Sequence, residues 1–151
     1  MSLTINKENC TVRIQALFYD ILKADTNVTN KTSHIMDGSA PEMYKGSGTY
    51  VIIRSPMVKR SRQSGDYSNQ KGVGREHIII FSKTESVARA LNDAVVEAIE
   101  DARTSGVLGS HNVSKVLINS GEPREELKVS DDISSIWMFD VYIDFEVKLD
   151  V

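Results

Sequence analysis

The segment 58–77, VKRSRQSGDYSNQKGVGREH, concentrates positive charge in the middle of the sequence. Only Asp66 and Glu76 oppose that charge, and glycine and serine residues divide its second half. Guanidinium and ammonium groups bind phosphates and carboxylates. The segment is therefore a candidate interaction loop that contacts nucleic acid or a phosphate group, or becomes ordered on an acidic protein partner. Its basic residues are Lys59, Arg60, Arg62, Lys71 and Arg75.

A group of carboxylates near the C-terminal end is the natural counterpart of this loop. It comprises Glu122, Glu125, Glu126, Asp131 and Asp132. Their spacing does not match a calcium-binding loop, and a solvated connection is a simpler interpretation than a metal site. A third interpretation is an acidic contact surface that meets the basic loop of a neighbouring subunit, extended by Asp140, Asp144 and Glu146. Complementary charge of this kind sets the orientation and choice of partners.

Residues for catalysis or metal binding do not come together in the sequence. The three histidines, His34, His77 and His111, lie on separate segments, and Cys10 has no histidine motif beside it. The glycines of 46–50 and 71–76 lack the Gly-Lys-Ser/Thr ending of a phosphate loop and are interpreted as turns. We therefore predict no catalytic residue, no metal site and no cofactor, and we expect a protein that is not an enzyme.

Composition limits the function further. The chain of 151 residues is predicted to form one domain, 1–151, with 40% apolar residues. A net charge of −3 argues against a protein that coats nucleic acid. A single cysteine fits a reducing compartment. The N-terminal segment lacks the apolar core of a secretion signal, and no apolar run approaches the roughly 20 residues of a membrane span, so we expect no membrane contact.

Hydrophobic periodicity predicts the elements that must position these residues. Apolar residues recur at helical spacing in 9–24 and again from Val87 to Ile99. Capping-box spacing from Ser82 to Glu85 precedes this second helix, and Gly106 is its expected stop. Strands are predicted at 33–36, 49–54, 77–81, 113–119 and 136–149. The last strand alternates almost perfectly between apolar and polar residues.

These elements predict an α+β fold. We expect a mostly antiparallel sheet with two helices packed on one face, and with the other face wet or in an interface. The basic segment then forms a long hairpin loop of about 20 residues between two strands, a length that is typical of functional or disordered loops. We also expect that aspartate in place of Phe139 or Ile143 prevents folding, because it buries an unpaired charge.

The layout resembles the tail terminator (tail completion, head-to-tail joining) proteins of long-tailed bacteriophages and proviruses. ALFYDILKADTNV (16–28) resembles the first helix of that family, and HIMDGSAPEMYKGSGTYVIIR (34–54) its short strand, turn and first hairpin strand. REHIIIFSKTESVARALNDAVVEAI (75–99) resembles its next strand and second helix, and SSIWMFDVYIDFEV (134–147) its closing strand. The long basic loop and the long final strand depart from the family pattern.

The resemblance implies a structural virion assembly protein that forms a ring, commonly a hexamer. Such a ring caps the tail tube, ends tail polymerisation and provides the head-docking surface. The implied partners are other copies of the chain, the tail tube protein and head-completion or connector proteins, with non-specific contact to DNA in the lumen. The implied location is the head–tail joint of the virion, after assembly in the host cytoplasm. The alternative is a small nucleic-acid- or protein-binding module that acts through the basic loop 58–76.

Overall fold

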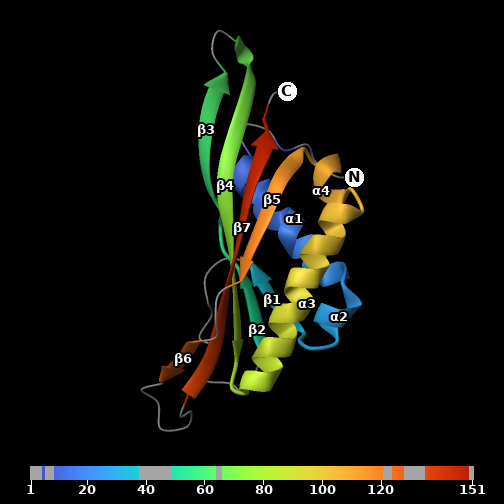
Figure 1. Ribbon diagram of the computed structural model, residues 1–151, viewed down its shortest axis with the longest axis vertical. Helices are drawn as coiled ribbons and strands as arrows, with labels where there is room; N and C mark the ends of the chain where they lie inside the picture. The colour runs from blue at the N-terminus through green and yellow to red at the C-terminus, as the bar shows by residue number, and fades with distance from the viewer. Residues whose placement is uncertain are drawn as a thin grey trace.

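The computed structural model describes residues 5, 9–37, 49–63, 66–120, 124–127 and 135–149, with backbone alone at 61–63, 66–70, 124–127 and 135–136. Helices and strands follow one another along the chain without repetition of a unit (Figure 1). In chain order they are α1 (Cys10–Ala24), α2 (Thr26–Thr29), β1 (His34–Asp37), β2 (Tyr50–Ile53), β3 (Met57–Gln63), β4 (Asp66–Ser82), α3 (Glu85–Thr104), α4 (Val107–Ser110), β5 (Val113–Ser120), β6 (Arg124–Leu127) and β7 (Ser135–Lys148).

Two long antiparallel strands form the spine of the sheet. β4 has 17 residues and β7 has 14, and their pairing runs from Lys71 opposite Lys148 to Ser82 opposite Trp137. The other edge of β4 carries β3 along one half and β2 along the other. The free edge of β7 is shared in the same way by β5 and β6, and β1 adds parallel to β2. The predicted α+β fold with a mostly antiparallel sheet is confirmed.

Helices α1 and α3 cover one face of this sheet (Figure 1). The helical stripe of α1 is buried as predicted, and Phe18 reaches Phe145 of β7 with ring centroids 6.4 Å apart. Small alanines alternate with Leu91 and Val95 on the buried side of α3, which lets this helix lie close to the strands. The apolar residues of β7 face the same core, including Phe139 and Ile143, so the predicted strand register is confirmed.

The basic segment is a strand hairpin and not a 20-residue loop. β3 and β4 pair from Met57 opposite Arg75 to Gln63 opposite Asp66, so β4 begins well before the predicted start at His77. Glycine and polar residues have low strand propensity. Here β3 and β7 satisfy the backbone of β4 on both edges, so hydrogen bonding in the ladder overrides the local preference.

Two glycines that were interpreted as turn residues lie inside β4 instead. A Cβ at Gly72 would lie 2.8 Å from Val58 Cγ1 and 3.0 Å from Val147 Cγ1. At Gly74 it would lie 2.7 Å from the carbonyl oxygen of Met57 and 2.8 Å from Phe145 Cζ. Both glycines therefore make room on the helix-covered face for the large side chains of β7 and for the backbone of β3.

The ends of the other elements differ from prediction in two places. The expected capping box is absent from the start of α3, because Ser82 is still in β4 and its hydroxyl accepts from the Thr84 amide at 3.2 Å. The predicted strand 113–119 extends to Ser120 as β5, and the short strand β6 follows it where no strand was predicted. Gly106 does follow the end of α3 as expected, in the left-handed region with φ of 86°.

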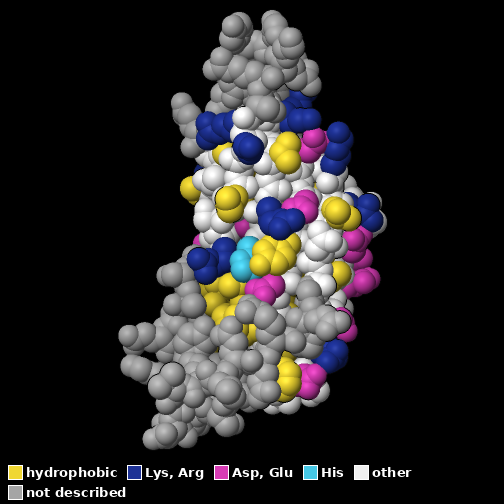
Figure 2. Space-filling view, turned by 60° about the vertical axis from the view of Figure 1, so that its left-hand side comes forward, with side chains coloured by type: hydrophobic (Ala, Val, Ile, Leu, Met, Phe, Trp, Pro, Cys, Tyr) yellow, Lys and Arg dark blue, Asp and Glu magenta, His cyan; other side chains and the backbone are white. Residues whose placement is uncertain are grey.

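Apolar residues are also buried on the sheet face opposite α1 and α3. Ile52, Ile79, Phe81 and Met138 form a second cluster there, with Met36 and Tyr50 packed against it. The cluster occupies the end of the sheet where β2 pairs with β4. The remainder of that face, toward the β3–β4 hairpin, presents polar and charged side chains with exposed apolar ones among them (Figure 2).

The packing at Gly74 predicts a large effect of a single methyl group. We expect Gly74→Ala to lower the free energy of unfolding by about 1–3 kcal/mol, because the Met57 carbonyl is backbone and has no rotamer to adopt. Urea unfolding measures the change. Gly109→Ala in α4 is the matched control, since its Cβ meets nothing within 4 Å, and it should be neutral or slightly stabilising. Equal stability of Gly74→Ala and wild type would contradict this packing.

Candidate interaction surface

The candidate site is the exposed part of the sheet face opposite α1 and α3, and we call it the open face. Alternation along the strands brings its residues to one side, because their neighbours in sequence point into the core. Strands β3, β4, β7 and β5 lie side by side there. The open face comprises Met57, Lys59, Lys71, Val73, Arg75, His77, Ser114, Lys115, Leu117, Asn119, Asp140, Tyr142, Asp144, Glu146 and Lys148.

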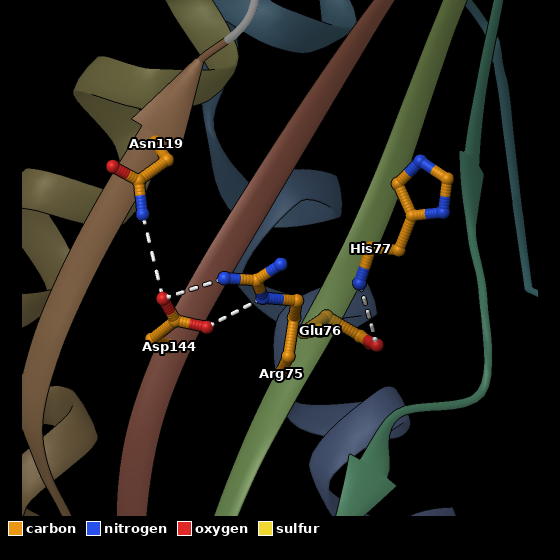
Figure 3. A network of polar contacts seen from close by, with 5 residues as sticks. All are labelled: Arg75, Glu76, His77, Asn119 and Asp144. Carbon is orange, nitrogen blue, oxygen red and sulfur yellow. Dashed lines mark hydrogen bonds and ion pairs between the residues drawn. The ribbon is translucent and has the colours of Figure 1, made fainter.

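Arg75 and Asp144 form a two-point ion pair at the middle of the open face (Figure 3). They are directly opposite in the β4–β7 register, with Nε donating to Oδ1 at 2.7 Å and Nη2 to Oδ2 at 3.1 Å. Asn119 of β5 adds a donor to Oδ2 at 3.4 Å. The hydrogen bonds from Arg75 lower the pKa of Asp144, and those bonds raise the pKa of Arg75. Asp144 therefore holds the arginine in a fixed orientation.

Glu146 sits between two lysines on the same face. Its Oε1 is 2.7 Å from Lys71 Nζ and its Oε2 is 2.8 Å from Lys115 Nζ. Lys115 reaches this position through an irregularity in β5, where its φ is 51° and the register with β7 shifts between Ser114 and Leu117. Hydrogen bonds from Lys115 and then Lys71 lower the pKa of Glu146. One carboxylate thus joins the two strands that flank β7.

Aromatic stacking continues the network toward the buried apolar cluster. The His77 ring stacks on Tyr142 with centroids 4.5 Å apart and an interplanar angle of 17°. Its Nε2 lies 2.8 Å from Asp140 Oδ1, and the Arg75 guanidinium carbon lies 5.1 Å from the Tyr142 ring centroid. His77 is partly buried, in agreement with the expected strand histidine. These contacts hold the side chains in a preformed arrangement.

The five predicted basic residues do not form one cluster. Lys59, Lys71 and Arg75 point to the open face, whereas Arg60 points to the helix side, where its Nη2 is 3.5 Å from Cys10 Sγ. Arg62 lies in β3 opposite Gln70, and its side chain is outside the described residues. Alternation along each strand separates them. A strand hairpin therefore distributes charges that an irregular loop would present together.

Acidic residues of the same chain neutralise part of the basic segment. We had expected Asp144 and Glu146 to extend a surface for a neighbouring subunit, but they bind Arg75 and Lys71 of their own chain. Glu125 and Glu126 lie in β6, opposite Trp137 and Ile136. Glu122, Asp131 and Asp132 lie outside the described residues. The acidic contact surface thus remains a prediction for the region around β6.

The remaining histidines and the cysteine have structural surroundings. His34 stacks against Tyr50 with centroids 4.8 Å apart, and His111 Nδ1 lies 3.0 Å from the Val107 carbonyl oxygen. Cys10 is buried at the start of α1. Within the part of the chain that the structure describes, no three His, Cys, Asp or Glu side chains gather in a way that could hold a metal ion. No helix in these ranges has the length and apolar character to cross a membrane.

Glu76 is the polar residue that sequence reasoning missed. It lies on the helix-covered side of β4, fully buried and opposite Ile143. Its Oε2 accepts from the His77 amide at 3.3 Å (Figure 3), and Oε1 is buried without a hydrogen-bond partner among the residues that the structure describes. Burial raises the pKa of Glu76 to about 8. The sequence did contain a signal of this burial, because Glu76 lies two residues before Ile78 and therefore on the same face of a strand. The signal was missed because the segment 58–76 was interpreted as a loop.

Comparison with known proteins gives one finding about the fold. No family model matches the sequence, and no curated protein sequence matches it. Among solved structures, the chain is similar to a chain of the structure described as "Virion of native gene transfer agent (GTA) particle", with a TM-score of 0.56 and 18% identity. The similarity covers 89% of this chain and 94% of that chain. At this identity, the two chains share a fold.

The buried Glu76 predicts a specific dependence of stability on pH. Below pH 4.5, Glu76 is protonated in both the folded and the unfolded chain, so its ionisation favours neither state. Between pH 4.5 and about 8, the unfolded chain ionises while the folded chain keeps the proton, so stability falls as pH rises. The full loss is on the order of 4–5 kcal/mol. Glutamine does not ionise, so Glu76→Gln has no such loss. The free energy of unfolding of Glu76→Gln should therefore rise relative to that of wild type as the pH increases across that range.

The measurement is the free energy of urea unfolding at pH 5 and pH 8 for both chains. Glu97→Gln on the exposed side of α3 is the control for loss of a carboxylate. A stability difference between Glu76→Gln and wild type that is the same at both pH values would contradict the buried, proton-bearing state.

Proposed function

We propose that this protein is a structural component of a phage-type virion, and that it acts as a tail terminator at the head–tail joint. One observation supports the virion role above the others. The fold matches, over nearly the whole of both chains, a chain of a native gene transfer agent particle. The layout that resembles tail terminators supports the finer assignment, in which a ring of copies caps the tail tube and offers a docking surface to the head.

The character of the open face supports a binding role rather than a catalytic one. Five of its charged groups are tied to one another across strands, with Asp144 held by Arg75 and Glu146 by Lys71 and Lys115. Paired in this way, they form a preformed and partly neutralised surface. Between the pairs it exposes Met57, Val73 and Leu117, which are 81%, 47% and 60% exposed. Exposed apolar residues among fixed polar groups suit contact with another protein.

The alternative of nucleic-acid binding through the basic segment has less support. Lys71 and Arg75 already bind carboxylates of β7, so they add little net positive charge for a phosphate backbone. Arg60 points toward α1, on the other face of the hairpin from Lys59. The basic residues of the segment 58–76 whose side chains are described are thus divided between the two faces of the hairpin and do not form one continuous track for a nucleic-acid strand.

Deletion of the gene in a host that produces the particles tests the proposed function. We expect filled heads and tails that are separate and no longer joined, with tails of irregular length, and we expect a plasmid copy of the gene to restore joined particles. Negative-stain imaging and particle titre are the readouts, with a plasmid lacking the gene as control. Normal joined particles in the deletion strain, together with absence of the protein from purified particles, would overturn the proposal.

A further inference from the structure

The helix layer has a groove that the described residues leave open. It has a volume of about 420 Å³ and lies between α1 and α3, close to α4. Leu17 and Ile21 of α1 face Ala98 and Ala102 of α3 across it, which gives it an apolar floor. Asp25 and His111 are among its polar lining residues. Asp20 and Asp101 line it as well, and both are exposed. Neither carboxylate makes an ion pair with the residues that the structure describes.

The open face, on the other side of the molecule, has a region that combines exposed apolar residues with a positive charge. Met57 and Val73 are exposed there on adjacent strands, and Lys59 lies directly opposite Val73 in the β3–β4 register. The lysine is exposed and makes no ion pair with the described residues, in contrast to Lys71 and Lys115. Two apolar side chains and one unpaired positive charge therefore form a patch on β3 and β4, which we call the hairpin patch.

We propose that the groove between α1 and α3 of one copy receives the hairpin patch of the next copy. Apolar side chains meet the apolar floor, and Lys59 meets the carboxylates of Asp20 and Asp101. The two surfaces are complementary in both polarity and charge, which favours a second copy of this chain over an unrelated partner. This inference rests on the proposed function, because it names the subunit contact of the proposed ring.

The positions of the two surfaces determine the kind of assembly. The groove belongs to the helix layer and the hairpin patch to the opposite face of the sheet, so the proposed contact joins two different surfaces of neighbouring copies (Figure 1). Each contact leaves a free groove on one copy and a free hairpin patch on the other. Such heterologous contacts close into a ring when the rotation between copies permits it.

Charge reversal tests the contact directly. Lys59→Glu places negative charge against an acidic groove, and the double variant Asp20→Lys, Asp101→Lys places positive charge against a basic patch. Sedimentation velocity over a concentration series should show at least about tenfold weaker assembly for each variant alone. An equimolar mixture of the two variants should regain assembly, because each reversed surface then meets its complement. The triple variant in one chain should regain it as well.

Matched controls separate this contact from a general effect of charge. Lys83→Glu and Asp93→Lys change exposed residues outside both surfaces and should assemble like wild type. Circular dichroism and thermal melts establish that every variant is folded. Assembly of the reversal variants at wild-type strength overturns the contact, as does a mixture that fails to regain assembly. A wild-type chain that stays monomeric at all concentrations also overturns it.

Failure of this contact and failure of the proposed function are distinguishable. Virion fractionation reports whether the protein belongs to the particle, whatever surfaces join its copies. If the protein is in the particle but the reversal variants assemble normally, the contact is wrong and the function stands. If the variants behave as expected but the protein is absent from particles, the contact stands and the function is wrong.

Discussion

The long antiparallel pairing of β4 with β7 is the constraint on which the rest of the structure depends. It is in register from Lys71 opposite Lys148 to Ser82 opposite Trp137, so it fixes the face of every side chain on both strands. A shift by one residue would expose the apolar residues of β7 and bury its acids. The pairing also supplies the two outer edges on which β2 and β3, and β5 and β6, are added.

The same register places chemistry of different kinds on the two sides of one strand. On the outer side, Arg75 meets Asp144 and His77 meets Tyr142, which gives a surface of fixed, mutually satisfied groups. On the inner side, Gly72 and Gly74 make room for the core, and Glu76 is buried with one oxygen that has no partner in the described part of the chain. β4 thus combines a well-satisfied surface with a core position that favours a protonated carboxyl.

Sequence patterns predicted the elements whose residues alternate strictly, and missed those whose stability comes from neighbouring strands. The alternation of β7 and the helical stripe of α1 were sufficient to predict these two elements. Burial of one face imposes a periodic pattern of apolar residues, and this pattern is visible in the segment alone. The β3–β4 hairpin was not predicted as strands, since its glycines and charges are acceptable only beside Phe145 and the carboxylates of β7. Tertiary context overrides local propensity at such positions.

The candidate site was predicted in part for the same reason. Lys71 and Arg75 were identified as interaction residues, and Asp144 and Glu146 as outward-facing acids, but their pairing within one chain depends on a register that no single segment encodes. Glu76 and Asn119 were missed because each has its role only through a contact between strands. The groove between α1 and α3 likewise arises from the packing of two helices that are distant in sequence.

Electron cryomicroscopy of the head–tail junction in purified particles tests the central claim most directly. The account predicts a closed ring at the junction whose subunit density fits this fold, with the β3–β4 hairpin of each copy against α1 and α3 of the next. A junction whose density contains no subunit with the β4–β7 spine flanked by two helices would contradict the account.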